Sequence, residues 1–302
     1  MSTVLVTLAT GQQGRATVAT LLGSGAKVRA VVRDPSNEKA SALAAKGVEL
    51  FKGGNDDFDV FRTAAAGCTA LFLNVLPYPV VQDPAAQAAG ILASCKDAGI
   101  AHVVLSSAGY AGARDKWDNS VNEASGLAAY YRHEYAVEEA ARRSGIASLT
   151  ILRPFWFHSN YIPPAGTRYY PDLLAKGELV HSQKPDDVFP HINVDDIGRF
   201  AALALLDPAK FGGEEIEFAS ENLNAKDVAA AFRNATGREV TLKARTEDEE
   251  KAAGPAVRWD LFAKTVDLTL DIGALKRKYD TFKFTTLEEY FKQQKANLAP
   301  PA

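Results

Sequence analysis

The first half of the chain alternates short runs of β-branched and aliphatic residues with longer alanine-rich segments whose apolar positions recur at helical spacing. This alternation is typical of parallel strands that helices cover on both faces. It predicts strands at 3–8, 27–32, 48–52, 70–75, 103–107 and 149–153, and helices at 12–23, 36–46, 57–67, 84–99 and 125–144. We therefore expect an α/β fold with a doubly wound parallel sheet, which binds ligands beyond the carboxyl ends of its strands.

Beyond Pro154 the pattern changes to an aromatic, turn-rich segment, FWFHSNYIPPAGTRYYPDLLAKGELVHSQ. The regular pattern resumes in a helix expected at 194–206 and in a strand-like stretch, EEIEFA. We expect a Rossmann-type nucleotide-binding core at 1–155, to which 191–220 returns. Segments 156–190 and 221–302 are expected to form a substrate-binding lid and a small C-terminal α+β lobe. Near the end of the chain, Thr285 and Glu288 in TTLEE indicate a helix capping box.

Composition narrows the classes of function. The chain has 302 residues, 47% of them hydrophobic, and a formal net charge of −3, so no basic field favours direct binding of nucleic acid or an anionic membrane. Cys68 and Cys95 lack metal-ligand spacing, so we expect buried thiols and no metal site. There is no charged-then-apolar leader and no apolar run near the roughly 20 residues that cross a bilayer. We expect a cytoplasmic protein that binds a small molecule or another protein.

The stretch VLVTLATGQQGRAT joins the first expected strand to its helix through a glycine-containing turn. Amide hydrogens at a helix start, aided by the helix dipole, attract a pyrophosphate. Gly11 would let the backbone approach the phosphate, and Gly14 would let the helix pack closely on the sheet. Leu8 stands where a dinucleotide-binding turn normally has its first glycine. We expect Leu8 to be accommodated in an extended conformation.

The end of the second expected strand indicates which dinucleotide binds. An acidic residue there would bond the ribose hydroxyls of NAD, but VRAVVRDP places Arg33 first after the apolar run. A guanidinium at this point suits the additional phosphate of NADP. Arg29, in the middle of the strand, is the less favourable candidate.

Taken together, VTLATGQQG, VVRDP, HVVLSSAG, TILRPFWFHSNYI, FPHINVDDIGRFAALAL and TTLEEYF resemble the NmrA-like family of atypical short-chain dehydrogenases, over nearly the whole chain. The resemblance implies an NAD(P)-binding domain with a small C-terminal lobe. Members of that family include quinone, azo-dye and phenylpropanoid reductases, fungal biosynthetic enzymes, and non-catalytic redox sensors or transcriptional co-regulators.

The resemblance also implies where NADP(H) would be held. It places phosphate contacts at Thr10, Gly11, Gln12, Gln13 and Gly14, and recognition of the 2'-phosphate at Arg33. Around the nicotinamide and its ribose it places Asn74, Val75, Leu76, Ser106, Ser107, Pro154, Phe155 and Phe157. Asn160 matches a recurrent asparagine of the lid.

Two positions depart from the family pattern. Where a Gly-Asp pair usually lies near the adenine, this chain has KGGND, so either Asn55 or Asp56 would have to serve or the contact is lost. The enzymes often carry a lysine on the helix before the sixth strand, four residues after a tyrosine. Counting back from Arg153 puts Tyr135 at that lysine position, with Tyr131 four residues before it.

The missing ammonium leaves the chemistry open. Tyr131 and Tyr135 are the candidate catalytic residues, since a tyrosine hydroxyl can donate to a developing oxyanion, although both could instead pack the helix on the sheet. The candidate substrate-binding residues are Trp156, His158, Asn160 and Tyr161. Other donors in the aromatic segment and its surroundings are His181, His191, Tyr169 and Tyr170, and Phe189 is a further pocket or core residue.

Three functions remain open on the sequence. The first is an NADPH-dependent reductase of a small apolar carbonyl, imine or conjugated double bond, with a role in secondary metabolism. The second is a non-catalytic NADP(H) sensor or regulator that binds a protein partner. The third is a redox-neutral biosynthetic enzyme on the same fold.

Overall fold

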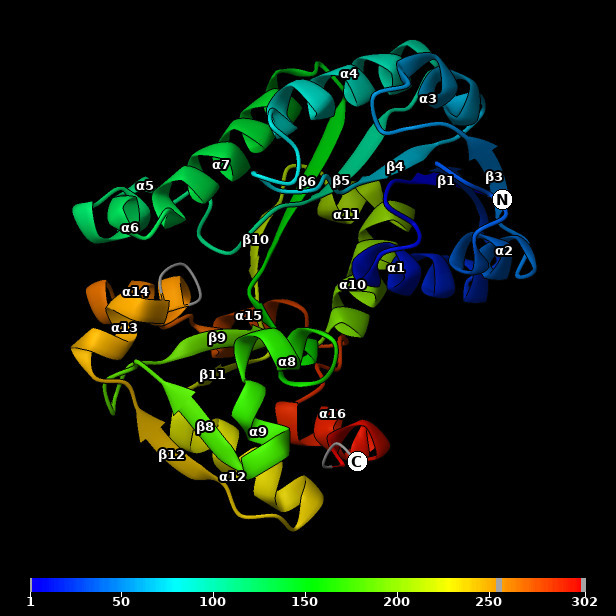
Figure 1. Ribbon diagram of the computed structural model, residues 1–302. Coiled ribbons are helices and arrows are strands. Elements are labelled where there is room, and N and C mark those ends of the chain that lie inside the picture. The colour runs from blue at the N-terminus through cyan, green and yellow to red at the C-terminus, as the bar shows by residue number, and fades with distance from the viewer. Residues whose placement is uncertain (1, 254–256, 300–302) are drawn as a thin grey trace. The chain divides into compact units, whose positions relative to one another are not determined.

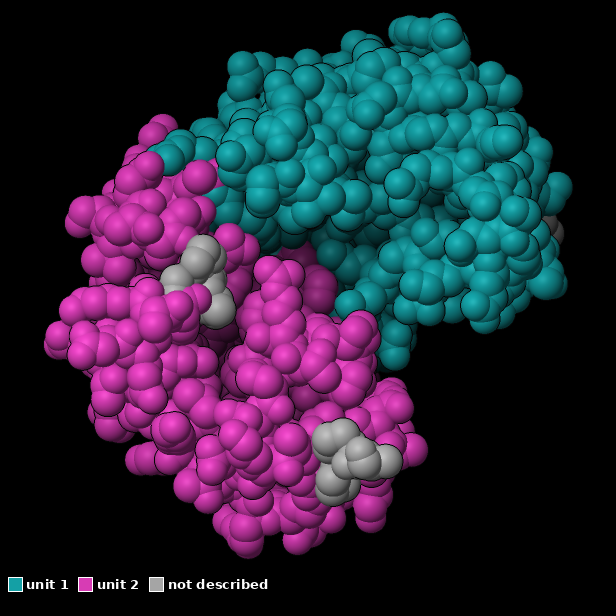
Figure 2. Space-filling model, viewed as in Figure 1, with its two compact units in different colours: residues 1–112, 130–153, 194–217 teal, residues 113–129, 154–193, 218–302 magenta. Residues whose placement is uncertain are grey.

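The computed structural model describes residues 2–253 and 257–299 (Figure 1). Its contacts divide the chain into two compact units (Figure 2). Unit 1 comprises 1–112, 130–153 and 194–217, and unit 2 comprises 113–129, 154–193 and 218–302. Each unit is therefore assembled from segments that are distant in the sequence.

Unit 1 is built on a seven-stranded, mostly parallel sheet with the order β10-β6-β5-β4-β1-β2-β3. The six strands expected in the first half of the chain are all present, and the order of β3 to β6 around β1 is that of a Rossmann sheet. The seventh strand, β10, comes from EEIEFA. The bounds are β1 Thr3–Val6, β2 Lys27–Val32, β3 Glu49–Lys52, β4 Ala70–Leu73, β5 His102–Ser106, β6 Ser148–Pro154 and β10 Glu215–Phe218.

Helices cover both faces of this sheet (Figure 1). On one face, α3, α4 and α7 bury an aliphatic core that includes Leu71, Ile91 and Val103. On the other face α1 packs against α10, and the two helices are so close that a Cβ on Gly198 would lie 2.4 Å from the backbone of Ala16. The bounds are α1 Gln12–Gly23, α2 Glu38–Ala44, α3 Phe58–Ala65, α4 Pro84–Asp97, α7 Leu127–Arg143, α10 Val194–Leu206 and α11 Pro208–Phe211.

Unit 2 contains two small sheets and several short helices. The strand orders are β11-β9-β7 and β12-β8. Its strands are β7 Trp156–Phe157, β8 Glu178–His181, β9 Phe189–Ile192, β11 Glu221–Leu223 and β12 Thr241–Ala244. Its helices are α5 Arg114–Trp117, α6 Ser120–Ala124, η1 His158–Tyr161, α8 Ala165–Tyr169, α9 Pro171–Lys176, α12 Ala225–Thr236, α13 Glu247–Ala253, α14 Arg258–Thr265, α15 Ile272–Lys278, α16 Leu287–Gln293 and η3 Lys295–Leu298.

Two local details differ from the sequence expectation. Residues 113–129 group with unit 2 instead of the core, because α6 packs against α14 and Lys116 Nζ donates to Asp267 O over 2.6 Å. The capping box of α16 uses Thr286 and Glu289, one position later than Thr285 and Glu288. The sequence TTLEE offers both registers, and the helix begins at Leu287, which is buried.

The cysteines lie in the core of unit 1. Cys68 and Cys95 are both buried free thiols, and burial raises the pKa of Cys95 to about 12. Along 2–253 and 257–299, none of the helices combines the length and the apolar character that a membrane crossing requires.

Candidate functional site

The turn between β1 and α1 leaves the start of α1 open to an anion. Gly11 is the N-cap residue in an extended conformation, no side chain caps the helix, and its first turn has no acidic residue. Such a helix start attracts a phosphate through its amide hydrogens and its dipole. A Cβ on Gly14 would lie 2.3 Å from Leu8 O, so the helix could not approach the turn with any larger residue there. These residues fit a pyrophosphate cradle.

Leu8 does not have the extended conformation expected from the sequence. Its φ is +46°, in the left-handed region that glycine adopts without strain. The tight turn explains this, because Leu8 O accepts a 2.8 Å hydrogen bond from Gly11 N and brings the chain around to the start of α1. The turn therefore keeps the geometry that the usual first glycine would give, at a cost in strain.

Hydrogen bonds bring other predicted cofactor residues to the same sheet edge. Ser106 Oγ, at the end of β5, donates to Gln13 Oε1 over 2.6 Å. The Thr7 hydroxyl, directly after β1, accepts from Asn74 N over 2.7 Å. Gln13, Asn74 and Ser106 thus lie together beyond the carboxyl ends of β1, β4 and β5, where doubly wound sheets bind their ligands.

Arg33 lies directly after β2, at the same edge of the sheet. Its side chain is exposed and makes no hydrogen bond or ion pair with the residues that the structure describes. The neighbouring Asp34 accepts from Ser36 N and Ser36 Oγ at 2.9 and 2.6 Å, and these bonds lower its pKa. Arg29 is occupied elsewhere, since it pairs with Glu49 at 2.7 Å and donates to the backbone oxygens of Ala64 and Ala66 at the C-terminal end of α3. Arg33 is therefore the available guanidinium.

Of the remaining predicted cofactor residues, some already have hydrogen-bond partners within the protein and others do not. Asn55 is half-buried after β3, whereas the Asp56 carboxylate accepts from Gln87 over 2.8 Å. Ser107 donates to Glu138 and is therefore occupied. Thr10, Gly11 and Gln12 lie in the turn, Val75 and Leu76 follow β4, and Pro154, Phe155 and Phe157 group with unit 2.

A buried ion-pair network not anticipated from the sequence lies behind this edge. Arg153, in β6, binds the fully buried Glu138 through two hydrogen bonds of 2.8 and 2.7 Å and also pairs with Glu215 and Glu217 from β10. Burial raises the pKa of Glu217 to about 7, against the opposing effect of its bond from Tyr110 N. The network fixes the segment after β5, because the Arg153 guanidinium also fills the space that a Cβ on Gly112 would need.

The two candidate catalytic tyrosines differ in their surroundings. Tyr131 is buried, and its hydroxyl donates to Gly109 O over 2.9 Å. Tyr135 is half-buried. In this arrangement the Tyr131 hydroxyl proton is used to hold the segment after β5. Neither residue has a lysine neighbour on α7.

Tyr131→Phe is expected to destabilise the protein by about 1–2 kcal/mol, because Gly109 O loses a buried donor. If Tyr131 is mainly structural, turnover should fall by no more than about tenfold, below the usual range for a general acid. Urea unfolding and steady-state kinetics would measure both, with Tyr135→Phe as the control. Complete loss of turnover with intact NADPH binding would instead make Tyr131 an essential acid.

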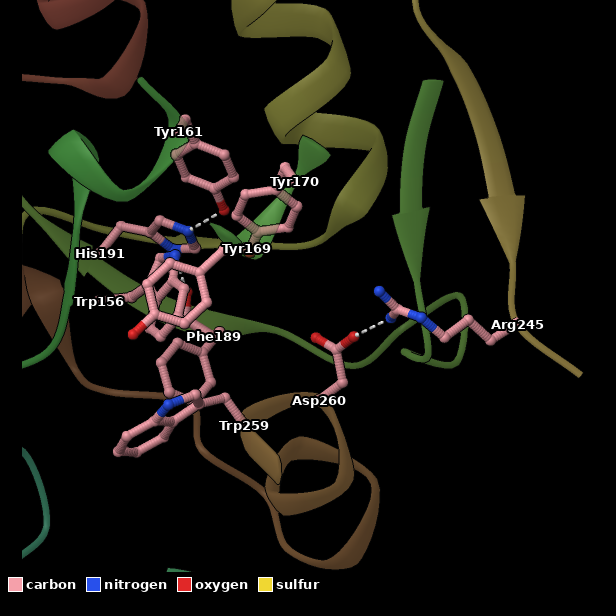
Figure 3. A pocket seen from close by; sticks show the side chains of 9 residues that line it. All are labelled: Trp156, Tyr161, Tyr169, Tyr170, Phe189, His191, Arg245, Trp259 and Asp260. Carbon is pink, nitrogen blue, oxygen red and sulfur yellow. Dashed lines mark hydrogen bonds and ion pairs between the residues drawn. The ribbon is translucent and has the colours of Figure 1, made fainter. Parts of the chain in front are cut away.

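A second candidate site lies wholly within unit 2 (Figure 3). It is a small pocket of about 20 Å³ with aromatic walls on one side and a charged pair on the other. The Trp156 ring contacts Tyr169 edge-on, with 4.9 Å between centroids, and lies 5.9 Å from Trp259. The lining residues are Trp156, Tyr161, Tyr169, Tyr170, Phe189, His191, Arg245, Trp259 and Asp260. Aromatic faces of this kind suit a flat apolar ligand, and a ligand larger than a water molecule would require the lining side chains to move.

The polar groups of this pocket are held by hydrogen bonds. The Tyr161 hydroxyl and His191 Nε2 lie 2.8 Å apart, and His191 Nδ1 lies 2.6 Å from Phe189 O. Burial lowers the pKa of His191 to about 4, so its imidazole is neutral at pH 7. Asp260 pairs with Arg245 at 3.2 Å and accepts from Ser182 N at 2.8 Å. Burial raises the Asp260 pKa, and the Ser182 bond and Arg245 oppose that effect.

The predicted substrate residues are only partly in this pocket. Trp156 and Tyr161 line it, whereas Asn160 is half-buried outside its wall. His158 is fully buried behind the wall, and neither ring nitrogen has a hydrogen-bond partner among the described residues. Arg245, Trp259 and Asp260 were missed, because no spacing in the sequence links residues 245–260 to the aromatic segment.

Comparisons with known proteins agree with this architecture. The model of the NmrA-like family matches residues 1–291. The NmrA-like family domain-containing oxidoreductase malD of Malbranchea aurantiaca is 29% identical over 247 residues, which cover 76% of this chain and 71% of the relative. Quinone oxidoreductase 2 of Escherichia coli is 25% identical over 253 residues, covering 83% of this chain and 80% of that protein.

A solved structure shares the fold over nearly the full length. The crystal structure of NmrA, a negative transcriptional regulator in complex with NADP, superposes with a TM-score of 0.77 at 20% sequence identity. The match covers 98% of this chain and 97% of that one. At this identity the comparison establishes the fold alone.

Proposed function

Because the chain belongs to the NmrA-like family, we propose that it is an NADP(H)-dependent oxidoreductase that reduces a small apolar or aromatic carbonyl, imine or conjugated double bond. The observation that carries the cofactor assignment is Arg33, exposed and unpaired among the described residues, beside an Asp34 that Ser36 already occupies. The oxidoreductases among the relatives support the reaction type.

The residues present fit the proposed cofactor. The uncapped start of α1 would take the pyrophosphate, and the glycines there leave room that a Cβ would fill. Arg33 would bind the 2'-phosphate, and the ends of β4 and β5 would surround the ribose and nicotinamide. When bound, NADPH supplies the hydride. The chain's own contribution is to place the ring, exclude water and provide a proton.

The substrate class is inferred from the pocket of unit 2. Its aromatic wall offers flat apolar surface, and Asp260 with Arg245 offers a polar end. A planar aromatic compound with one polar group suits that combination. The relative named quinone oxidoreductase supports a flat substrate of this kind.

Arg33→Ala is expected to weaken NADPH binding by about tenfold or more and to leave NADH binding nearly unchanged, because a charge-assisted bond to a phosphate contributes roughly 1.5–3 kcal/mol. Calorimetric titration of both nucleotides would measure this. Arg29→Ala is the matched control, since Arg29 is engaged by Glu49 and should not change the preference. A wild-type protein that binds NADPH and NADH equally would contradict the assignment.

NADPH oxidation across a panel of quinones, enones, imines and azo compounds tests the reaction itself. Turnover of a flat aromatic member supports the proposal. One observation favours a second function, an NADP(H)-dependent binding protein: the Tyr131 hydroxyl is engaged by Gly109 O. Tight NADPH binding without turnover of any panel member would favour that alternative.

A further inference from the structure

Glu134 is a buried carboxyl on the sheet-facing side of α7. Its side chain is 8% exposed and shares this side with the buried residues Tyr131, Val137, Glu138 and Ala141. Glu138, one turn further along, binds Ser107 and Arg153. Glu134 has no hydrogen bond or ion pair with any residue that the structure describes, and its carboxyl oxygens are not fully shielded from solvent. A mostly buried carboxyl that no side chain engages, and that solvent can still reach, is open to a ligand.

The neighbours of Glu134 place it at the ligand-binding edge of the sheet. Glu138 accepts from Ser107, the residue directly after β5, and Tyr131 donates to Gly109 O, two residues further on. Glu134 lies between them, about 6 Å along the helix from Glu138 toward the N-terminus of α7. It therefore lies beyond the carboxyl ends of β5 and β6, where a doubly wound sheet binds its ligand.

Burial and, to a lesser extent, the surrounding charges favour the neutral form of Glu134. On α7 it faces Glu138, whose charge is compensated by Arg142 and by Arg153 from β6. From β10, Glu215 and Glu217 use the same two arginines, so no cation is left over for Glu134. Burial, with a smaller contribution from the charge of Glu138, raises the pKa of Glu134 to about 8. At neutral pH the group is therefore a carboxylic acid with an O–H to donate.

We propose that Glu134 is the proton donor of the reduction. This rests on the proposed function. In the reduction of a carbonyl, NADPH held at the start of α1 and at Arg33 would supply the hydride that carbon accepts and would leave as NADP⁺. The C=O π electrons move to oxygen, and oxygen takes the proton of Glu134. The resulting carboxylate regains a proton from solvent. Glu134 thus supplies the acid that the engaged Tyr131 hydroxyl does not.

The protonation state can be tested without turnover, by comparing wild type with Glu134→Gln. Between pH 4.5, the ordinary value, and about 8, the folded wild type holds a proton that the unfolded chain has lost. The contribution of Glu134 to stability is therefore fully present below pH 4.5 and is lost as pH rises toward 8. Relative to Glu134→Gln, the unfolding constant of wild type should rise about tenfold per pH unit across that window. Glu38→Gln, which removes an exposed carboxyl at the start of α2, is the control for a change of Glu to Gln as such.

The donor role is tested by kinetics on the compound that wild type turns over. Glu134→Gln should lower kcat by about 100-fold or more, within the range for a general acid, while the NADPH Kd changes less than about threefold. The wild-type kcat should fall above about pH 8, and the residual rate of the variant should be flat there. Glu134→Asp keeps the acid, so it should give an intermediate kcat and keep a pH dependence.

Two results would overturn the proposal. The first is that the free energies of unfolding of wild type and Glu134→Gln run parallel from pH 5 to 8. Glu134 would then be ionised in the folded protein. The other is a kcat of Glu134→Gln within about threefold of wild type. If wild type oxidises no NADPH with any panel compound, the donor role fails with the proposed function. The stability curves distinguish the two failures. If they still show that Glu134 is protonated in the folded protein, the description of the carboxyl holds and only the proposed reaction is wrong.

Discussion

Binding of both NADPH and NADH is expected to weaken by at least about 100-fold in Gly11→Val, because the valine methyl groups would cover the start of α1 where the pyrophosphate meets the backbone. The fold should survive. Gly11 has φ −78° and ψ 177°, an extended conformation that valine adopts readily, and its Cβ would lie no closer than 3.1 Å to Leu8 O. Calorimetric titration and circular dichroism would measure the two expectations.

Leu8→Gly is the matched control for this turn. It replaces a left-handed leucine with the residue that suits φ +46°, so nucleotide binding should be retained and the free energy of unfolding should not fall. If Gly11→Val binds NADPH as wild type does, the phosphates lie elsewhere.

Arg153→Met is expected to lower the free energy of unfolding by about 3–5 kcal/mol, the usual cost of removing one partner of a buried ion pair. Glu138 is fully buried and would lose its two bonds from the Arg153 guanidinium. Glu217 would lose a cation at the same time. Urea unfolding at pH 7 would measure the loss.

Arg142→Met is the control, since Arg142 bonds Glu138 and Glu215 but its side chain is 29% exposed. Its loss should cost at most about 1 kcal/mol, as is usual for pairs open to water. Equal losses in the two variants would mean that Glu138 is held by the pair of arginines jointly and not mainly by Arg153.

The helices and strands could be predicted from the sequence because the spacing of apolar residues that marks them lies within each segment. The expected helix at 12–23 and the expected strand at 27–32 match the structure to the residue, and both follow from apolar spacing and glycine positions. The position of Arg33 after β2 was predictable for the same reason, since it follows from where an apolar run ends.

Other features depend on contacts between distant residues. The positive φ of Leu8 goes with the hydrogen bond that Leu8 O accepts from Gly11 N. A leucine followed by a glycine three residues later does not predict that conformation. Asp260, in α14, meets Arg245 and Ser182, which directly follow β12 and β8. One local feature of the sequence hinted at Glu134. Its spacing from Tyr131 and Glu138 places it on the same side of the helix, where the other residues are apolar. Only the structure shows that this side is buried.

The packing of α10 on α1 has a consequence for how the protein is made. The helix that follows the glycine turn buries one side against residues 194–206, and β6 lies between β5 and β10 at 215–218. A ribosome that has released residues 1–153 has therefore not yet supplied α10, which covers α1, or β10, the second neighbour of β6. The nucleotide-binding unit can close only after most of the chain has emerged, so we expect its early strands to depend on chaperones during synthesis.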